Sequence, residues 1–227
     1  MGAAVVKVSD NVTKTEVDDL RTDTTGNITL TSLTEDKGDL ATINGFTDVI
    51  LSTANITVTD DVNKSEVDTI NTYNDAGGVV TVSSITDNFS NISTVQGTAG
   101  ISIGTALITA TDAVTLANAN SLNGFTNAQV TLNAVQDTVS NITSINAITT
   151  SDVSMGAAAV TVTDAASLAN ATAINGFTTG KVTLNSVEDT YAKIQDIKSI
   201  ADGEVDMGAA AVKVSDNVTK TEVDDLR

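Results

Sequence analysis

A repeat of about 52 residues constrains the fold of this chain more than any other feature. A short motif, seen as VKVSD, ITVTD, ITATD and VTVTD, recurs with its aspartate at intervals of 50, 52, 52 and 52 residues. These aspartates are Asp10, Asp60, Asp112, Asp164 and Asp216. A fixed period in this range is typical of solenoids, in which each unit buries its apolar face on its neighbour.

A larger repeat of 206 residues encloses four of these units. Residues 1–21 return as residues 207–227, and the only difference is Val5 against Ala211. We therefore predict that residues 207–227 begin a second large repeat. The first large repeat, 1–206, would consist of the four units 1–50, 51–102, 103–154 and 155–206.

Met1 also fits the repeat. It occupies the position that Met155 and Met207 occupy inside the chain. The sequence therefore predicts that Met1 is an ordinary repeat residue and that the chain is part of a longer protein.

Each unit has the pattern of two half-units, one short and one long. Segment 56–59 alternates apolar residues with threonine, which predicts a half-buried strand. A second strand is expected to begin in each unit at Ile28, Val80, Val130 and Val182. Brief apolar alternations predict a third, short strand at 49–51, 101–103, 153–155 and 205–207.

Short helices are predicted after the strands. Apolar residues lie 2, 7 and 10 positions after the repeated aspartate, as in Val62, Val67 and Ile70. Spacings near three favour an α-helix or a 3₁₀ turn. The sequence NGF at Asn44, Asn123 and Asn175 is expected to end helices, because Gly and Asn accept a left-handed conformation.

The predicted fold class is a β-rich repeat solenoid, elongated, with parallel β ladders and short helices or 3₁₀ turns between the strands. Strands in a ladder lie about 4.8 Å apart, whereas packed helices need roughly twice that width. A helix in every coil would therefore curve the stack, and a straight stack needs helices in alternate coils or narrower turns. A coil of half a unit and a coil of a whole unit both fit the pattern.

Composition and charge exclude several functions. The net charge of −18 argues against partners that are nucleic acids or anionic membrane surfaces, and no apolar run approaches the ~18 residues of a membrane span. The chain contains no His and no Cys, so Ser/His and Cys/His catalysis is excluded, and its carboxylates recur by repeat position instead of converging. We predict that the chain is not an enzyme. Its acidity and its richness in Thr, Asn and Ser favour an extracellular or cell-surface location.

Calcium is the cofactor that the sequence suggests. The five repeated aspartates would form a column of like charges at one level of the stack, and Ca²⁺ binds carboxylate oxygens. The alternative is a column of helix caps, in which each aspartate accepts hydrogen bonds from backbone N–H groups, as we also expect for Asp137 and Asp189.

Two further surface features are predicted from short motifs. Threonine pairs such as Thr29/Thr31, Thr57/Thr59, Thr109/Thr111 and Thr161/Thr163 would stack on one face, which is a pattern compatible with ice binding. N-glycosylation motifs begin at Asn11, Asn63, Asn88, Asn141, Asn170 and Asn217, and also at Asn91, Asn27 and Asn55. We expect the last two to be buried, because they stand at strand starts.

VTVTDAASLANATAING and VTLNSVEDTYAKIQDIKSI resemble the V-T-V-T-D repeats of giant bacterial surface proteins, known from cyanobacteria and other marine bacteria. The resemblance covers most of the chain. It implies a secreted or cell-surface role and possible dependence on calcium, because those repeats occur beside haemolysin-type calcium-binding segments. The glycine-rich nonapeptide of such segments is absent here.

These observations predict an extracellular structural protein that builds a filament, a rod or a surface layer (S-layer) by stacking its repeats. Its partner would be itself, through head-to-tail repeats and lateral copies. The alternatives are an adhesin stalk or ligand-binding solenoid, and an ice-binding solenoid.

Overall fold

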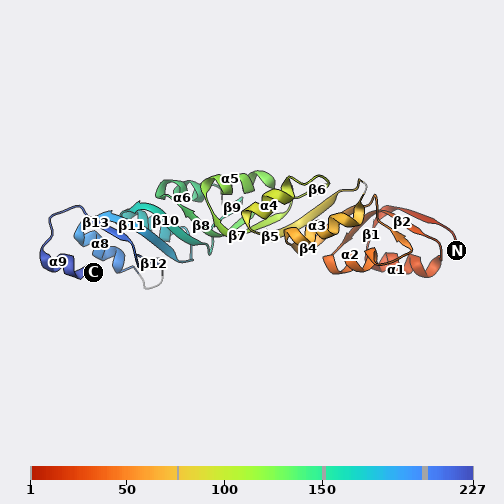
Figure 1. Ribbon diagram of the computed structural model, residues 1–227, viewed down its shortest axis with the longest axis horizontal. Coiled ribbons are helices and arrows are strands. Elements are labelled where there is room, and N and C mark those ends of the chain that lie inside the picture. The colour runs from red at the N-terminus through yellow and green to blue at the C-terminus, as the bar shows by residue number, and fades with distance from the viewer. Residues whose placement is uncertain (1, 76, 150–151, 201–203, 227) are drawn as a thin grey trace. The chain divides into compact units, whose positions relative to one another are not determined.

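The computed structural model describes residues 2–75, 77–149, 152–200 and 204–226. The chain forms two compact units (Figure 1). Unit 1 contains residues 1–108 and 125–128, and unit 2 contains residues 109–124 and 129–227. Met1, whose place in the repeat was predicted above, lies outside the described residues.

The order of elements follows the sequence repeat. Residues 1–50 hold β1 (Val6–Val12), α1 (Lys14–Asp23), β2 (Ile28–Glu35), α2 (Lys37–Asn44) and β3 (Val49–Ile50). Residues 51–102 hold β4 (Asn55–Val62), α3 (Lys64–Asn71), the 3₁₀ turn Thr72–Asn74, β5 (Val80–Asp87), α4 (Phe89–Gln96) and β6 (Ile101–Ser102). Residues 103–154 hold β7 (Leu107–Val114), α5 (Leu116–Phe125), β8 (Val130–Asp137), α6 (Val139–Asn146) and β9 (Val153–Ser154). Residues 155–206 hold β10 (Ala159–Ala166), α7 (Leu168–Asn175), β11 (Val182–Asp189), α8 (Tyr191–Lys198) and β12 (Val205–Asp206), followed by β13 (Ala211–Val214) and α9 (Lys220–Asp225).

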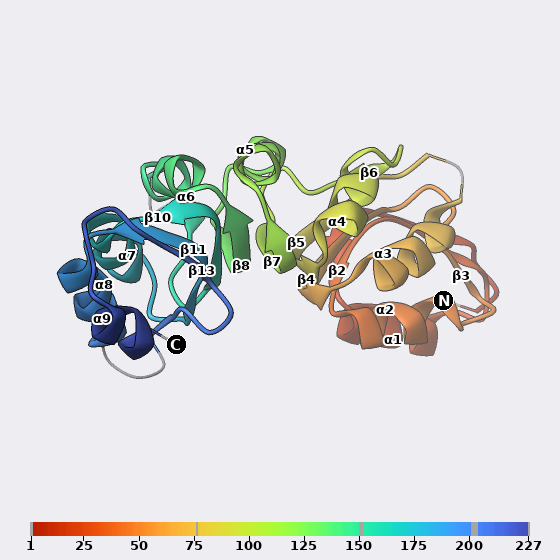
Figure 2. The ribbon, with the colours of Figure 1, turned by 60° about the vertical axis from the view of Figure 1, so that its left-hand side comes forward.

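Strands of successive half-units pair in parallel, which confirms the predicted β-rich solenoid. In unit 1 the neighbours are β1–β2, β2–β4 and β4–β5, and in unit 2 they include β8–β10 and β10–β11. One coil is therefore one half-unit, made of a strand, a helix and a return loop. In Figure 2, helices α1 to α3 lie together on one side of strands β2, β4 and β5. The predicted third strands are confirmed as β3, β6, β9 and β12.

The strand ladder is staggered. Strand β2 pairs along both halves with β1, but on its other edge its first half pairs with the short β3 and its second half with the start of β4. Ile56 of β4 therefore lies level with Leu33, not with Ile28. The same arrangement recurs in unit 2, where the first half of β8 pairs with β9 and its second half with β10.

The stagger explains how every coil can carry a helix although the strands lie only about 4.8 Å apart. An offset from Ile28 to Leu33 is five residues, or about 16 Å along a strand, and two rungs of the ladder add about 10 Å across it. Equivalent helices are then about 19 Å apart, which leaves about 9 Å for each of the two helices in a unit. Packed helices lie about 8–10 Å apart, so every coil from α1 to α8 can carry an α-helix.

A bulge corrects the predicted end of the first strand. The register of β4 with β5 shifts between Val58 and Asp61, so that β4 carries one extra residue there and continues past Asp60 to Val62. The prediction that Val62 belongs to the helix is therefore wrong, and its repeat equivalents Val12, Val114 and Ala166 likewise end strands. The extra residue in the bulge shifts the alternation of apolar and polar residues. In the sequence this shift looked like the start of a helical spacing.

The core is a column of stacked aliphatic side chains inside each unit. Leu33, Ile56 and Val80 are partners in successive ladders and are all fully buried. Burying one such side chain stabilises the fold by about 1.5–3 kcal/mol. Apolar residues of the helices, such as Val67 and Ile70, close the core from the opposite side.

The helix ends differ from the predicted mechanism. Helices α2 and α7 end at Asn44 and Asn175, as predicted from NGF, whereas α5 continues past Asn123 to Phe125. The cap residues Gly45 and Gly176 have φ of −75° and −74° and are right-handed, so the predicted left-handed stop is wrong. Among the described residues, no helix is long and apolar enough to cross a membrane.

Candidate functional site

The helix N-termini form a polar joint that recurs from coil to coil. Several begin with a local cap, for example Asn63, whose side chain accepts a hydrogen bond from the Glu66 N–H at 3.1 Å. Glu66 in turn accepts from the Asn63 N–H at 3.0 Å, which completes a capping box. Local caps leave the N–H of the first helical residue without an intrahelical partner.

The missing partner comes from the next coil. Asp137, the last residue of β8, accepts a hydrogen bond from the Leu116 N–H, the first residue of α5, at 2.8 Å. Asp87 and Asp189 do the same for the N–H groups of Lys64 and Leu168, at 2.9 and 3.1 Å. We call this contact the cross-coil cap. It joins neighbouring coils through a charged acceptor placed at the positive end of a helix.

The repeated aspartates Asp60, Asp164 and Asp216 make the cross-coil cap at three further junctions. Asp60 accepts from the Lys37 N–H at 3.0 Å, Asp164 from the Val139 N–H at 2.8 Å, and Asp216 from the Tyr191 N–H at 2.9 Å. The predicted capping role is thus seen for these three residues. The expectation that each caps the helix of its own coil is wrong, because each accepts a hydrogen bond from the first N–H of the helix in the preceding coil.

The carboxylates at the ends of the long half-unit strands are held by several donors. Asp137 also accepts from the Thr138 N–H and from the Asn141 side-chain amide, both at 2.8 Å. Burial alone would raise the pKa of Asp137, but these hydrogen bonds stabilise the anion and leave its pKa below the ordinary value. The pKa values of Asp87 and Asp189 are lowered in the same way, against the effect of burial.

The structure does not gather the predicted calcium ligands. Successive bulges belong to alternate coils, so the repeated aspartates are not on neighbouring strands. The strand between two bulges has its own carboxylate, at a different position along the strand. Among the described residues, no three or more acidic side chains are grouped closely enough to hold a metal ion. Asp10 is exposed at the outer side of β1, and Asp112 has its own interaction. Calcium binding by these residues remains a prediction.

Several asparagines of the glycosylation motifs take part in capping. Asn63 and Asn88 cap α3 and α4, and the side chains of Asn141 and Asn170 bond to Asp137 and Ser167. Asn11 accepts hydrogen bonds from Ser32 and Thr34, and Asn217 is exposed. The expected burial of Asn27 and Asn55 is wrong, because both are exposed. Glycan attachment remains a prediction.

The threonine pairs are not partners of one another in the strand ladder. Because of the stagger, Thr57 lies between Thr34 and Thr81 in the ladder, whereas Thr29 lies between Lys7 and Ile50. In unit 2, Thr161 lies between Gln136 and Thr183. The register therefore separates the pairs whose predicted alignment suggested ice binding.

A polar clasp that the sequence did not reveal closes each short half-unit. Four polar side chains at equivalent positions are buried, with exposed fractions of 2% to 7%: Thr24, Asn74, Thr126 and Thr178. The Thr178 hydroxyl donates to the carbonyl of Ala158 at 2.7 Å and accepts from the Gly180 N–H at 2.8 Å. This contact ties the loop after the helix to the start of the strand in the same coil. The sequence did not predict this contact, because one Thr or Asn per unit does not stand out in a chain rich in both residues.

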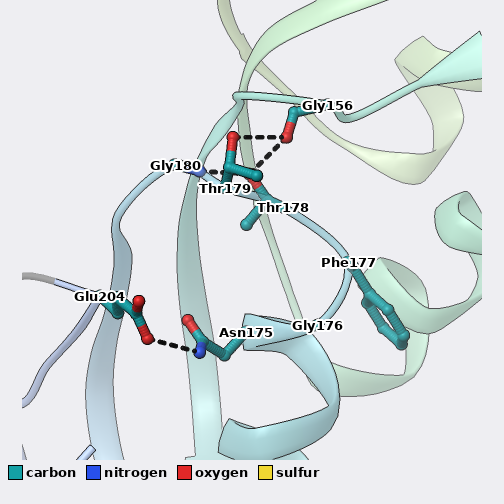
Figure 3. A pocket seen from close by; sticks show the side chains of 8 residues that line it. All are labelled: Gly156, Asn175, Gly176, Phe177, Thr178, Thr179, Gly180 and Glu204. Carbon is teal, nitrogen blue, oxygen red and sulfur yellow. Dashed lines mark hydrogen bonds between the residues drawn. The ribbon is translucent and has the colours of Figure 1, made fainter. Parts of the chain in front are cut away.

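Glycine stands close to the backbone at several of the clasps, whereas Ala128 takes the place equivalent to Gly180 in the clasp of Thr126. A Cβ atom at Gly180 would lie 2.3 Å from the carbonyl oxygen of Ala158, and one at Gly78 would lie 1.9 Å from that of Ala54. Figure 3 shows the clasp beside a shallow cavity of about 390 Å³, where Glu204 accepts a hydrogen bond from Asn175. The cavity is lined mainly by residues of the loops around Gly156 and 175–180, together with Glu204.

Comparison with known proteins adds no family to this description. No family model matches the chain, and no significant match is found among curated proteins or among solved structures.

Proposed function

We propose that this chain is a structural segment of an extracellular assembly, in which stacked coils build a filament, a rod or a surface layer. The observation that carries the proposal is the recurrence of one inter-coil joint. The same parallel pairing and the same cross-coil cap appear in both units, with Asp60 in unit 1 and Asp164 in unit 2 as equivalent residues.

Such a joint suits a structural role. Each coil presents a carboxylate on one side and an unpaired helix N–H on the other, so an added coil always meets the same partner groups. Stability in a stack of this kind is a sum over neighbouring coils and does not need a central core. A near-identical return after 206 residues provides equal contacts at equal intervals.

Electron microscopy of protein isolated from its natural source tests the proposal. We expect long fibres or regular arrays of uniform width, labelled at the cell exterior by an antibody against the chain. Monodisperse globular particles would contradict it. Single rods that end in a distinct head would instead support the stalk of an adhesin.

A further inference from the structure

We infer that the chain unfolds in steps of one 52-residue repeat, so that under tension it lengthens repeat by repeat while the remaining repeats stay folded. The 52-residue repeats are the ranges 1–50, 51–102, 103–154 and 155–206, and each holds two coils. In a stack of coils, the segment that unfolds as one body is set by which neighbours are joined most strongly. The inference concerns the single chain and does not depend on the proposed assembly.

The two coils of one repeat are joined along the whole length of their strands. In the repeat 51–102, residues 56–62 of β4 pair with residues 80–85 of β5, on both sides of the bulge. On its other edge, the first half of β5 pairs with β6, which belongs to the same repeat. In the repeat 155–206, β10 pairs with β11 in the same way and β11 pairs with β12. Both halves of the strands therefore hold the two coils of a repeat together.

Further hydrogen bonds reinforce the joint inside the repeat. The Ile56 N–H donates to the Val79 carbonyl at 2.8 Å, and the Val79 N–H donates to the Asn55 side chain at 3.0 Å. The cross-coil cap inside this repeat is Asp87, which is also held by the side-chain amide of Asn91 at 2.9 Å. The strand ladder, the loop and the cap thus all link the coil of β4 to the coil of β5.

The joint between two repeats is shorter. Residues 32–35 of β2 pair with residues 55–58 of β4, whereas the first half of β2 pairs with β3 of its own repeat. In unit 2 the ladder between β8 and β10 is equally short, because β9 takes the first half of β8. The helices pack on both of their neighbours, so the difference between the two kinds of joint lies in the strand ladder and its polar contacts.

The polar contacts across this boundary centre on Lys37. Its N–H is capped by Asp60, and its ammonium group pairs with Glu66 at 2.8 Å and donates to the Asp61 carbonyl at 3.1 Å. The side chains of Lys37 and Glu66 are 41% and 34% exposed, and exposed ion pairs contribute little to stability. We therefore expect the joint between β2 and β4 to open before the joint between β4 and β5.

Hydrogen exchange measured by mass spectrometry on the full chain tests the size of the unfolding step. Ile56 is completely buried and is the ladder partner of Leu33 in the preceding repeat and of Val80 in its own repeat. The variant Ile56→Ala therefore weakens the packing on both sides of β4. We expect exchange to become at least several-fold faster in α4, in the same repeat, and to change by less than about twofold in α2, in the preceding repeat.

The reciprocal variant is Leu33→Ala, on the other side of the same boundary. It should speed exchange in α1 of its own repeat and leave α3 of the next repeat nearly unchanged. Equal acceleration of α2 and α4 in Ile56→Ala would overturn the inference, because each coil would then be coupled equally to both neighbours. Acceleration confined to α3, or spread over the whole chain, would overturn it as well. If Ile56→Ala does not fold, the milder Ile56→Val is read by the same criteria.

Stretching the natural chain between its two ends with optical tweezers is a second test and needs no substitution. An extended chain spans about 3.3–3.6 Å per residue, so a repeat that is about 19 Å long when folded should lengthen by about 160 Å. We expect successive steps of this size. Steps of about 80 Å would show that single coils unfold, and one step for the whole chain would show a single cooperative body; either result would overturn the inference.

Discussion

At the scale of single residues, the carboxylate of the cross-coil cap is expected to add to the free energy of unfolding. The variant Asp137→Asn keeps the shape of the side chain but removes its charge at the N-terminus of α5, where it meets the Leu116 N–H. Loss of a helix cap costs about 0.5–2 kcal/mol. We expect a fall of this size in the free energy of unfolding, measured by urea titration. Asp196→Asn on the exposed face of α8 is the matched control and should change it by less than about 0.5 kcal/mol.

The same carboxylates predict how stability depends on pH. The pKa values of Asp87, Asp137 and Asp189 are lower in the folded chain than in an unfolded one. Their contribution is therefore fully present above the unfolded pKa, at about pH 4, and is lost as the pH falls through the lower folded values. We expect the melting temperature to drop below about pH 4, and to drop less steeply in Asp137→Asn. Parallel curves for the two proteins would contradict the assignment.

Glycine in the polar clasp supplies a third residue-scale prediction. In Gly180→Ala the new Cβ would lie 2.3 Å from the Ala158 carbonyl oxygen, so the backbone would have to shift. We expect a loss of about 1–3 kcal/mol, as for overpacked interiors, measured by thermal unfolding. Gly124→Ala lies in α5 with open space around it and should be neutral or stabilising by up to about 1 kcal/mol. Equal effects of the two substitutions would show that the close approach at Gly180 is relieved.

At the scale of elements, local patterns predicted the strands and helices well, but not how neighbouring coils are aligned. The three-residue spacing of Ile92 and Val95 correctly predicted α4, and the alternation at Val153 correctly predicted β9. Strand β2 was recognised only in its first half, because Ser32 interrupts the alternation while the strand continues to Glu35. The bulge at Asp60, the stagger and the partner of each cap depend on contacts between coils, which no local pattern in one coil encodes.

The column of buried aliphatic side chains predicts which strand positions contribute most to the free energy of unfolding. In Ile56→Ala a completely buried side chain between Leu33 and Val80 is replaced by a cavity. Substitutions of this kind cost about 2–5 kcal/mol, and we expect a loss in this range on urea unfolding. Ile50→Ala, at a residue of β3 that is 36% exposed, should cost clearly less. A similar loss for both would place the core elsewhere.

At the scale of the whole molecule, the acidic residues have two opposed effects. Individually, Asp60, Asp164 and Asp216 stabilise helix N-termini, but together with the other carboxylates they give a net charge of −18. Self-repulsion of this charge opposes contact between copies at low salt and is screened as ionic strength rises. Assembly of copies should therefore be favoured by salt, and divalent cations should act more strongly than monovalent ones.

Comparing two divalent cations distinguishes screening from a calcium site. A general charge effect is nearly the same for Mg²⁺ and Ca²⁺, whereas a site built from carboxylates in flexible geometry selects Ca²⁺. Because Asp60 and Asp164 are engaged by backbone N–H groups of separate coils, we expect the melting temperature to rise equally with either ion at matched ionic strength. The measurement is thermal unfolding with each ion and after chelation. A rise specific to Ca²⁺ that chelation reverses, and that the Asp60→Asn variant loses, would instead establish the predicted calcium site.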